Sequence, residues 1–137
     1  MNELVSFEVA KLAKRKGFSA KCKHSYSETG AFYEDLESSN EFDYDNRMVV
    51  LGDNDEIKMN DLVAAPTIFQ LSEWLRVRHK IFPQITISKY SHPDYIEYEG
   101  RVIKFNSSDR KYSSNLNRSV EYMNCYNTTL FCCLQYI

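Results

Sequence analysis

The feature that most constrains the fold of this chain is a helix signal at Thr67 that gives way to short strand-like segments. Thr67 and Gln70 have the spacing of a capping box, in which each side chain satisfies the other residue's backbone N–H. The predicted helix ends near Lys80, because backbone just before Pro83 disfavours the helical conformation. One stripe of this helix carries Ile68, Leu71, Leu75 and Arg78, with Trp74 beside it. A helix followed by strands predicts a mixed α+β fold.

An earlier helix is predicted over residues 6–16. Ser6 is a favourable N-cap residue, and the three bases of residues 14–16 fall in the last turn, where the helix dipole favours positive charge. Gly17 follows as the residue that closes the helix, with Phe18 as its hydrophobic partner. This segment therefore contains both a start and a stop signal.

Three antiparallel strands are expected after the second helix, over residues 84–90, 95–98 and 101–105. The last two form a hairpin around Glu99 and Gly100, which places Ile96 opposite Ile103. One face of this meander is then apolar and the other mixed, as in a sheet that helices cover on one side only.

A long helix is predicted from about Ser113 to the last residue. Its apolar positions repeat with alternating spacings of four and three, interrupted once by a polar residue. Two interpretations stay open: the helix packs on the free face of the sheet, or it forms a homodimer seam in which a pair of Asn127 side chains fixes the register. The seam residues are Leu116, Val120, Met123, Asn127, Leu130 and Leu134.

The charges of the chain are segregated, although the net charge is only −2. Residues 28–61 contain eleven acids and two bases, whereas residues 76–118 contain nine bases and four acids. We expect residues 21–61 to form an acidic, loop-rich and mobile region, with strands at 47–51 and 56–59 around a turn at 52–55. The length of 137 residues fits a single domain over 1–137.

No catalytic or metal-binding motif is found. The chain has four glycines, none in a phosphate-binding pattern, and its four cysteines lack the paired spacing of a zinc site. Reduced cysteines that act as small core residues are the simpler interpretation. We therefore expect no enzyme activity, no cofactor and no metal. With no signal peptide and no long apolar run, a cytoplasmic location is expected.

Basic and aromatic side chains intermingle in the second half of the chain. They provide a candidate nucleic-acid surface, because bases bind phosphates and aromatic rings stack on nucleobases. The alternative is that they are surface residues that balance the acidic segment. The candidate binding residues are Arg76, Arg78, His79, Tyr95, Tyr98, Arg101 and Lys104.

Two segments resemble a group of short, uncharacterised proteins encoded by bacteriophages and prophages of gut bacteria. They are residues 5–18, which read VSFEVAKLAKRKGF, and residues 65–82, which contain APT followed by WLR. The resemblance implies a phage origin and a cytoplasmic location in the host cell, and it implies no activity. The segment from Tyr112 onward departs from the short acidic, Ala-rich helix of that group.

A second resemblance concerns the order of elements alone. A helix, three antiparallel strands and a helix also follow one another in double-stranded-RNA-binding domains, which recognise duplex shape and phosphates. His92 and Pro93 lie in the first strand connection, and Arg110 and Lys111 precede the last helix.

These observations lead to one main functional hypothesis and two alternatives. The main hypothesis is a non-enzymatic phage accessory protein that binds a host protein, for example in counter-defence. The first alternative is a module that binds duplex RNA or DNA through its basic face. The second is a small-molecule sponge that holds a nucleotide at a homodimer interface through Arg and Tyr side chains. No membrane partner is expected.

Overall fold

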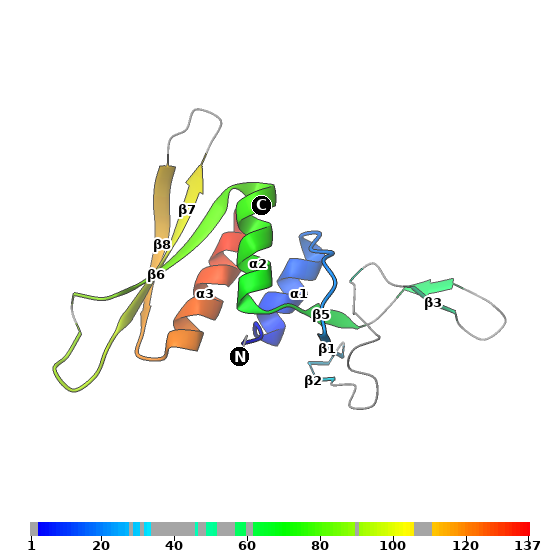
Figure 1. Cartoon of the computed structure of the whole chain (residues 1–137), viewed down its shortest axis with the longest axis horizontal. Helices are drawn as coiled ribbons and strands as arrows, with labels where there is room; N and C mark the ends of the chain where they lie inside the picture. The colour runs from blue at the N-terminus through cyan, green and yellow to red at the C-terminus, as the bar shows by residue number, and fades with distance from the viewer. Residues whose placement is uncertain are drawn as a thin grey trace. The chain divides into compact units, whose positions relative to one another are not determined.

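The computed structural model describes residues 3–27, 29–30, 32–33, 46, 49–51, 57–59, 62–89, 91–105 and 111–137. The chain divides into two compact units, Met1–Leu71 and Ser72–Ile137 (Figure 1). These are called unit 1 and unit 2. A single domain over the whole chain stays a prediction.

Unit 1 begins with helix α1 (Phe7–Arg15), which confirms the predicted N-terminal helix. The Ser6 hydroxyl accepts a hydrogen bond from the Val9 N–H at 3.4 Å, as expected of an N-cap. The chain leaves the helix through Gly17, whose φ of 94° lies in the left-handed region that favours glycine. The buried face of α1 consists of Val9, Ala10, Leu12 and Ala13.

The sheet of unit 1 has the antiparallel order β2-β1-β5. Its strands are β1 (His24–Tyr26), β2 (Phe32–Tyr33) and β5 (Val63–Ala65), and α1 packs against β5. A separate antiparallel pair consists of β3 (Val49–Leu51) and β4 (Ile57–Met59). These two strands fall within the segments predicted at 47–51 and 56–59. The turn predicted at 52–55 and the mobility predicted for residues 21–61 lie outside the described residues for most of their length.

Asn46 is a buried polar residue that ties unit 1 together. Its side-chain N–H donates to the Phe18 carbonyl at 2.9 Å, and its side-chain oxygen accepts from the Ala64 N–H at 2.8 Å. The residue therefore links the segment after α1 to the middle of β5. Both bonds are shielded from water, where an unmade hydrogen bond is costly.

Helix α2 (Ile68–Trp74) starts with the predicted capping box. The Thr67 N–H donates to the Gln70 side chain at 2.9 Å, and the Gln70 N–H donates to the Thr67 hydroxyl at 3.0 Å. The helix continues as a π-helical turn, η2 (Leu75–His79), and stops at Lys80, which has a φ of 57°. The predicted end near Lys80 is confirmed, and Leu71 and Leu75 of the predicted stripe are fully buried.

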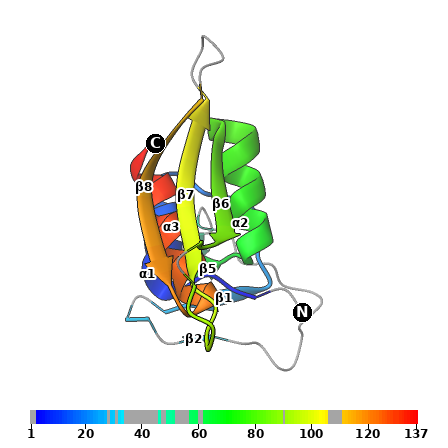
Figure 2. The same cartoon turned by 90° about the vertical axis from the view of Figure 1, so that its left-hand side faces the viewer.

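Unit 2 contains a three-stranded antiparallel sheet in the order β6-β7-β8. Its strands are β6 (Ile81–Ile87), β7 (Tyr98–Phe105) and β8 (Lys111–Ser119). Helix α3 (Tyr122–Gln135) packs against one face, and Figure 2 shows α3 behind the strands. The order of helix, three-stranded meander and C-terminal helix confirms the predicted α+β fold. The core of this unit includes Ile81, Val102, Leu130 and Leu134.

The predicted hairpin around Glu99 and Gly100 is wrong. Both residues lie inside β7, where Glu99 pairs with Thr86 and Arg118, and Gly100 pairs with Ile85 and Asn117. Gly100 is needed for packing and not for a turn, because an added Cβ would overlap the Thr129 hydroxyl of α3. A glycine that permits close approach and a glycine that permits a turn look the same in a sequence.

The predicted start of the last helix near Ser113 is also wrong. Residues 111–119 form β8, and α3 begins only at Tyr122. The serines and asparagines of residues 113–117 are weak helix formers. These residues instead form an edge strand whose backbone pairs with β7 on one side, which the apolar spacing alone did not reveal.

Candidate functional site

The candidate binding residues do not form one surface. Tyr98 and Lys104 lie at opposite ends of β7, six residues apart, which corresponds to roughly 20 Å along a strand. The η2 turn contacts β6, whose first residue, Ile81, pairs with Lys104. The seven residues therefore separate into a basic end, an aromatic end and Arg101 between them.

The basic end is formed by Arg76, Arg78, His79 and Lys104. Burial lowers the pKa of His79, and the neighbouring charges of Arg78 and Lys104 lower it further. The Lys104 ammonium donates to the Tyr136 carbonyl at 3.0 Å, so it closes the end of α3. Arg76 forms an ion pair with Glu73 on the same helix. Two of the four predicted bases at this end are thus engaged within unit 2.

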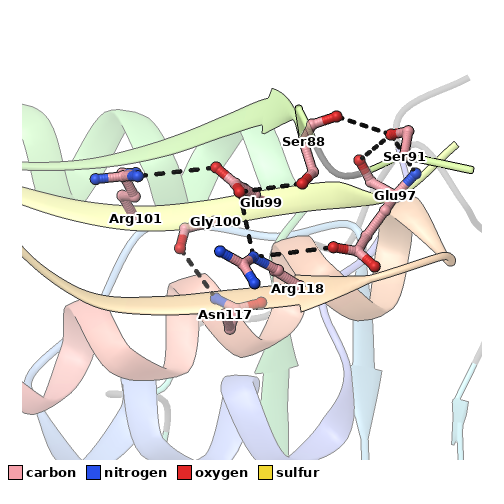
Figure 3. Close-up of polar contacts among 8 residues, drawn as sticks. All are labelled: Ser88, Ser91, Glu97, Glu99, Gly100, Arg101, Asn117 and Arg118. Carbon is pink, nitrogen blue, oxygen red and sulfur yellow. Dashed lines mark hydrogen bonds and ion pairs between the residues drawn. The ribbon is translucent and has the colours of Figure 1, made fainter.

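Arg101 belongs to a polar network on the sheet face opposite α3 (Figure 3). Glu99 is the centre of this network, and only 8% of the residue is exposed. Its carboxylate accepts from the Ser88 hydroxyl at 3.1 Å and from the Arg118 Nε at 3.2 Å, with the Arg101 guanidinium at 3.8 Å. A buried carboxylate of this kind is stabilised by its partners, so the network is structural.

The same network fixes the connection between β6 and β7. The Ser91 hydroxyl accepts from the Glu97 N–H at 2.9 Å and donates to the Ser88 carbonyl at 2.9 Å (Figure 3). The Arg118 Nε lies 3.8 Å from the Glu97 carboxylate. The backbone on both sides of the connection is therefore held to the sheet, and this orders the neighbouring surface.

That neighbouring surface is rich in exposed apolar side chains. Eight large hydrophobic side chains are exposed among the described residues, and five of them lie where β6 ends, β7 begins and β8 leads into α3. Ile87 is 65% exposed and Val120 is 58% exposed. We call this surface the apolar end, and it consists of Ile87, Tyr95, Ile96, Tyr98, Val120 and Tyr122.

Pairing and ring contacts hold the apolar end together. Ile87 pairs with Tyr98 across the sheet, and the ring of Tyr98 meets that of Tyr122 edge-on at 5.2 Å. In the connection, the Tyr95 ring stacks on His92 at 5.1 Å with an interplanar angle of 12°. Ring contacts of this kind position side chains without burying them.

The charges around the apolar end are mixed and slightly acidic. Residues 87–98 and 119–123 contain one lysine, Lys89, and three acids, Asp94, Glu97 and Glu121. His92 lies beside Asp94, with its Nδ1 atom 3.5 Å from the carboxylate. The surface therefore combines an apolar centre with a polar rim.

The predicted homodimer seam is not a continuous helical stripe. Leu116 belongs to β8, Val120 lies in the turn before α3, and only the later seam residues are helical. Leu130 and Leu134 are fully buried in the core of unit 2, and the Asn127 amide donates to the Met123 carbonyl at 3.0 Å. Packing on the sheet, the first of the two interpretations, is what α3 does.

The cysteines have the character of core residues. Cys22, Cys125 and Cys133 are buried as free thiols, and Cys132 is half-buried. Burial and the adjacent Cys132 raise the pKa of Cys133 to about 12, which keeps it protonated and unreactive. Within the described part of the chain, no group of three His, Cys, Asp or Glu side chains is arranged to hold a metal ion.

Comparison with known proteins gives no relative. No family model, no curated protein and no solved structure matches this chain. None of the helices in the described ranges is long and apolar enough to cross a membrane.

Sequence reasoning identified Tyr95 and Tyr98 of the apolar end and missed its other members. Ile96 was expected opposite Ile103 on the apolar face of the sheet, and Val120 was expected in the seam of the last helix. The one available signal was the concentration of Tyr and Ile around the His92–Pro93–Asp94 turn. Apolar residues beside a turn have few neighbours to bury them.

Proposed function

We propose that this protein is non-enzymatic and acts by binding another protein through the apolar end of unit 2. The observation that carries this proposal is the gathering of five exposed large hydrophobic side chains at one end of the sheet. Tyr and Ile side chains held in place by pairing and ring contacts give binding energy at low cost in conformational entropy.

The rim charges favour a protein over a nucleic acid as the partner. Nucleic-acid binding requires several Lys or Arg side chains that neutralise phosphates. The segments that form the apolar end carry one lysine against three acids. A partner with an apolar patch and a basic border matches this surface better than a phosphate backbone does.

The same charges favour a different protein over a second copy of this chain. In a two-fold symmetric dimer the same patch faces itself, so the acids of one rim meet those of the other. That arrangement is unfavourable, whereas a basic partner gains from it. Residues 5–18 and 65–82 resemble phage-encoded proteins. On this basis the proposal also includes the biological role: a phage-encoded accessory protein that binds a host protein and acts in counter-defence.

The test is affinity capture from a gut-bacterial lysate with the wild-type chain and two matched variants. Ile96→Asp places a charge in the apolar end, and Val77→Asp places the same charge on η2, where Val77 is also 56% exposed. We expect a protein that wild type and Val77→Asp both retain and that Ile96→Asp loses. Capture that is equal for all three proteins, or absent for all, would contradict the proposal.

Light scattering coupled to size exclusion, with absorbance at two wavelengths, separates the alternatives. A dimer that Ile96→Asp dissociates would show that the apolar end binds a second copy. Duplex RNA retained at low salt, and lost when Arg78 and Lys104 are replaced by Gln, would assign binding to the basic end. A monomer without bound nucleic acid agrees with a protein partner.

A further inference from the structure

A pocket of about 340 Å³ lies in unit 1, and all the residues that line it belong to that unit. It forms where the N-terminal segment, β1 and the start of α2 meet. Leu4 forms an isolated bridge with Thr67, and His24 pairs with Ala65 across the sheet, so backbone contacts position its walls. Its volume is at the small end of the range of roughly 300–1,000 Å³ that ligand pockets occupy.

Among the described residues that line the pocket, the one charged side chain is that of Lys23, which is basic. His24 lies next to it in the sequence and also lines the pocket, and none of these lining residues is acidic. This is notable in a chain whose net charge is −2. A recess in low-dielectric protein concentrates the field of the charges that line it, so this pocket favours a negatively charged ligand.

The apolar part of the lining requires a ligand with an apolar body. Leu4 and Ala65 contribute aliphatic surface. Phe69, which also lines the pocket, is 68% exposed, the highest value among the exposed large hydrophobic residues of the described chain. A flat group in the pocket would cover this ring and remove its apolar surface from water.

A positioned amide completes the lining. The Gln70 side chain accepts from the Thr67 N–H at 2.9 Å and donates to the Lys21 carbonyl at 3.2 Å, so both ends of its amide are fixed. A glutamine amide has two N–H donors. Within the residues that the structure describes, one is used, and the other is available to an oxygen acceptor of a ligand.

We infer that this pocket binds a small organic anion with a flat apolar body, such as an aromatic carboxylate. Lys23 supplies the charge that recognises the anionic group, Gln70 donates to it, and Phe69 covers the apolar body. This inference does not rest on the proposed protein–protein contact, because the pocket and the apolar end share no residue: the pocket is lined by residues of unit 1 and the apolar end by residues of unit 2.

The test is an amide chemical-shift titration of the full ¹⁵N-labelled chain with benzoate and with benzamide at constant ionic strength. Benzamide has nearly the same shape as benzoate and no charge. We expect benzoate to shift the amides of residues 4, 23–24 and 67–70 saturably, with a Kd on the order of 1 mM, as for other ligands of this size. Benzamide is expected to bind about tenfold more weakly, since it lacks the charge-assisted contacts.

Variants separate the pocket from general charge effects. Lys23→Gln and Phe69→Ala are each expected to weaken benzoate binding about tenfold, because each removes one recognition element. Arg15→Gln makes the same charge change at an exposed residue that does not line the pocket and is expected to leave the Kd unchanged. Shifts confined to other residues, equal binding of benzamide, or an unchanged Kd in Lys23→Gln would each overturn the inference.

Discussion

At Gly100, the backbone of β7 approaches α3 so closely that no side chain fits between them. An added Cβ would overlap the Thr129 hydroxyl and come within 2.8 Å of the Asn117 amide nitrogen. The Thr129 hydroxyl donates to the Cys125 carbonyl at 2.8 Å and accepts from Asn117 at 2.9 Å, so it is held in place. The close packing of α3 on β7 therefore requires a residue without a side chain at position 100.

Replacing Gly100 with Ala should lower the free energy of unfolding by about 1–3 kcal/mol, the usual cost of overpacking. Urea denaturation measures this. Thr129→Ala removes the obstructing hydroxyl and should partly rescue the first substitution, so the double variant loses less stability than the sum of the two single variants. Strict additivity would show that Gly100 and Thr129 do not interact.

The Glu99 network yields a second prediction at the scale of the residue. Glu99→Gln should lower the free energy of unfolding by about 1–3 kcal/mol, because Arg118 and Arg101 lose their shared charge partner in a shielded site. Glu73→Gln is the matched control, since Glu73 pairs with Arg76 at the surface. That change should cost no more than about 0.5 kcal/mol in thermal or urea denaturation. Equal costs would mean that burial of Glu99 is irrelevant.

The thiol of Cys133 should make the protein sensitive to alkaline pH. Its pKa is raised from 9.0 to about 12 in the folded chain, so above pH 9 the unfolded chain releases a proton that the folded chain keeps. The free energy of unfolding should then fall as pH rises, by up to about 1.4 kcal/mol per pH unit.

Urea midpoints measured between neutral pH and pH 11 test this dependence. Cys133→Ala should flatten it in part, because burial also raises the pKa of Cys125 and Cys132, which act in the same direction. A slope that is unchanged in Cys133→Ala would assign the effect to other groups.

At the scale of the element, the first two helices and the strand pair β3–β4 could be predicted from the sequence, whereas the pairing of β6, β7 and β8 and the start of α3 could not. The Ser6 cap, the Thr67–Gln70 box and the stop at Lys80 are signals between near neighbours in the chain, and all are present in the structure. A strand forms through hydrogen bonds to a partner strand, and the local sequence pattern does not identify that partner. Residues 113–119 were therefore assigned to a helix by their apolar spacing, although β7 provides a better partner for their backbone.

Asn46 shows how a single side chain can organise elements that are distant in sequence. Asn46→Ala should lower the free energy of unfolding by about 2 kcal/mol, because the Phe18 carbonyl and the Ala64 N–H both lose their buried partner. Asn46→Asp should be similarly damaging, since a carboxylate cannot donate to Phe18. Asn124→Ala, on the exposed surface of α3, is the control and should have little effect. Denaturation curves in which Asn46→Ala overlays wild type would contradict this.

At the scale of the whole molecule, the two compact units predict two levels of stability. Native-state hydrogen exchange should show that Asn46→Ala lowers protection in α1 and β5, whereas Gly100→Ala lowers it in β6, β7 and α3. Equal loss of protection throughout the chain in both variants would instead identify one cooperative domain, as the length of the sequence predicts.

The candidate surfaces show the same limit of sequence reasoning at this scale. The bases and aromatic residues of residues 76–104 were grouped because they are close in sequence, yet β7 separates Tyr98 from Lys104 by its length. The apolar end combines two stretches, residues 87–98 and 119–123, that only the pairing of β7 with β8 brings together. The pocket of unit 1 likewise combines Leu4, Lys23 and Phe69 from three separate segments.

The ladder between β7 and β8 changes register between Gly100 and Val102, so that residues 115 and 116 of β8 together face Arg101 alone. This surplus residue gives the chain a place where its length can change. Removing Asn115 would leave one residue of β8 opposite Arg101 and make the ladder regular. All remaining residues of β8 would keep their partners in β7 and their side of the sheet. Deletion of one residue from β7 would instead move the side chains on one side of the deletion to the opposite face of the sheet, which would expose core side chains to solvent. Among natural variants of this protein, losses of a single residue should therefore concentrate at this position of β8 and be absent from β7.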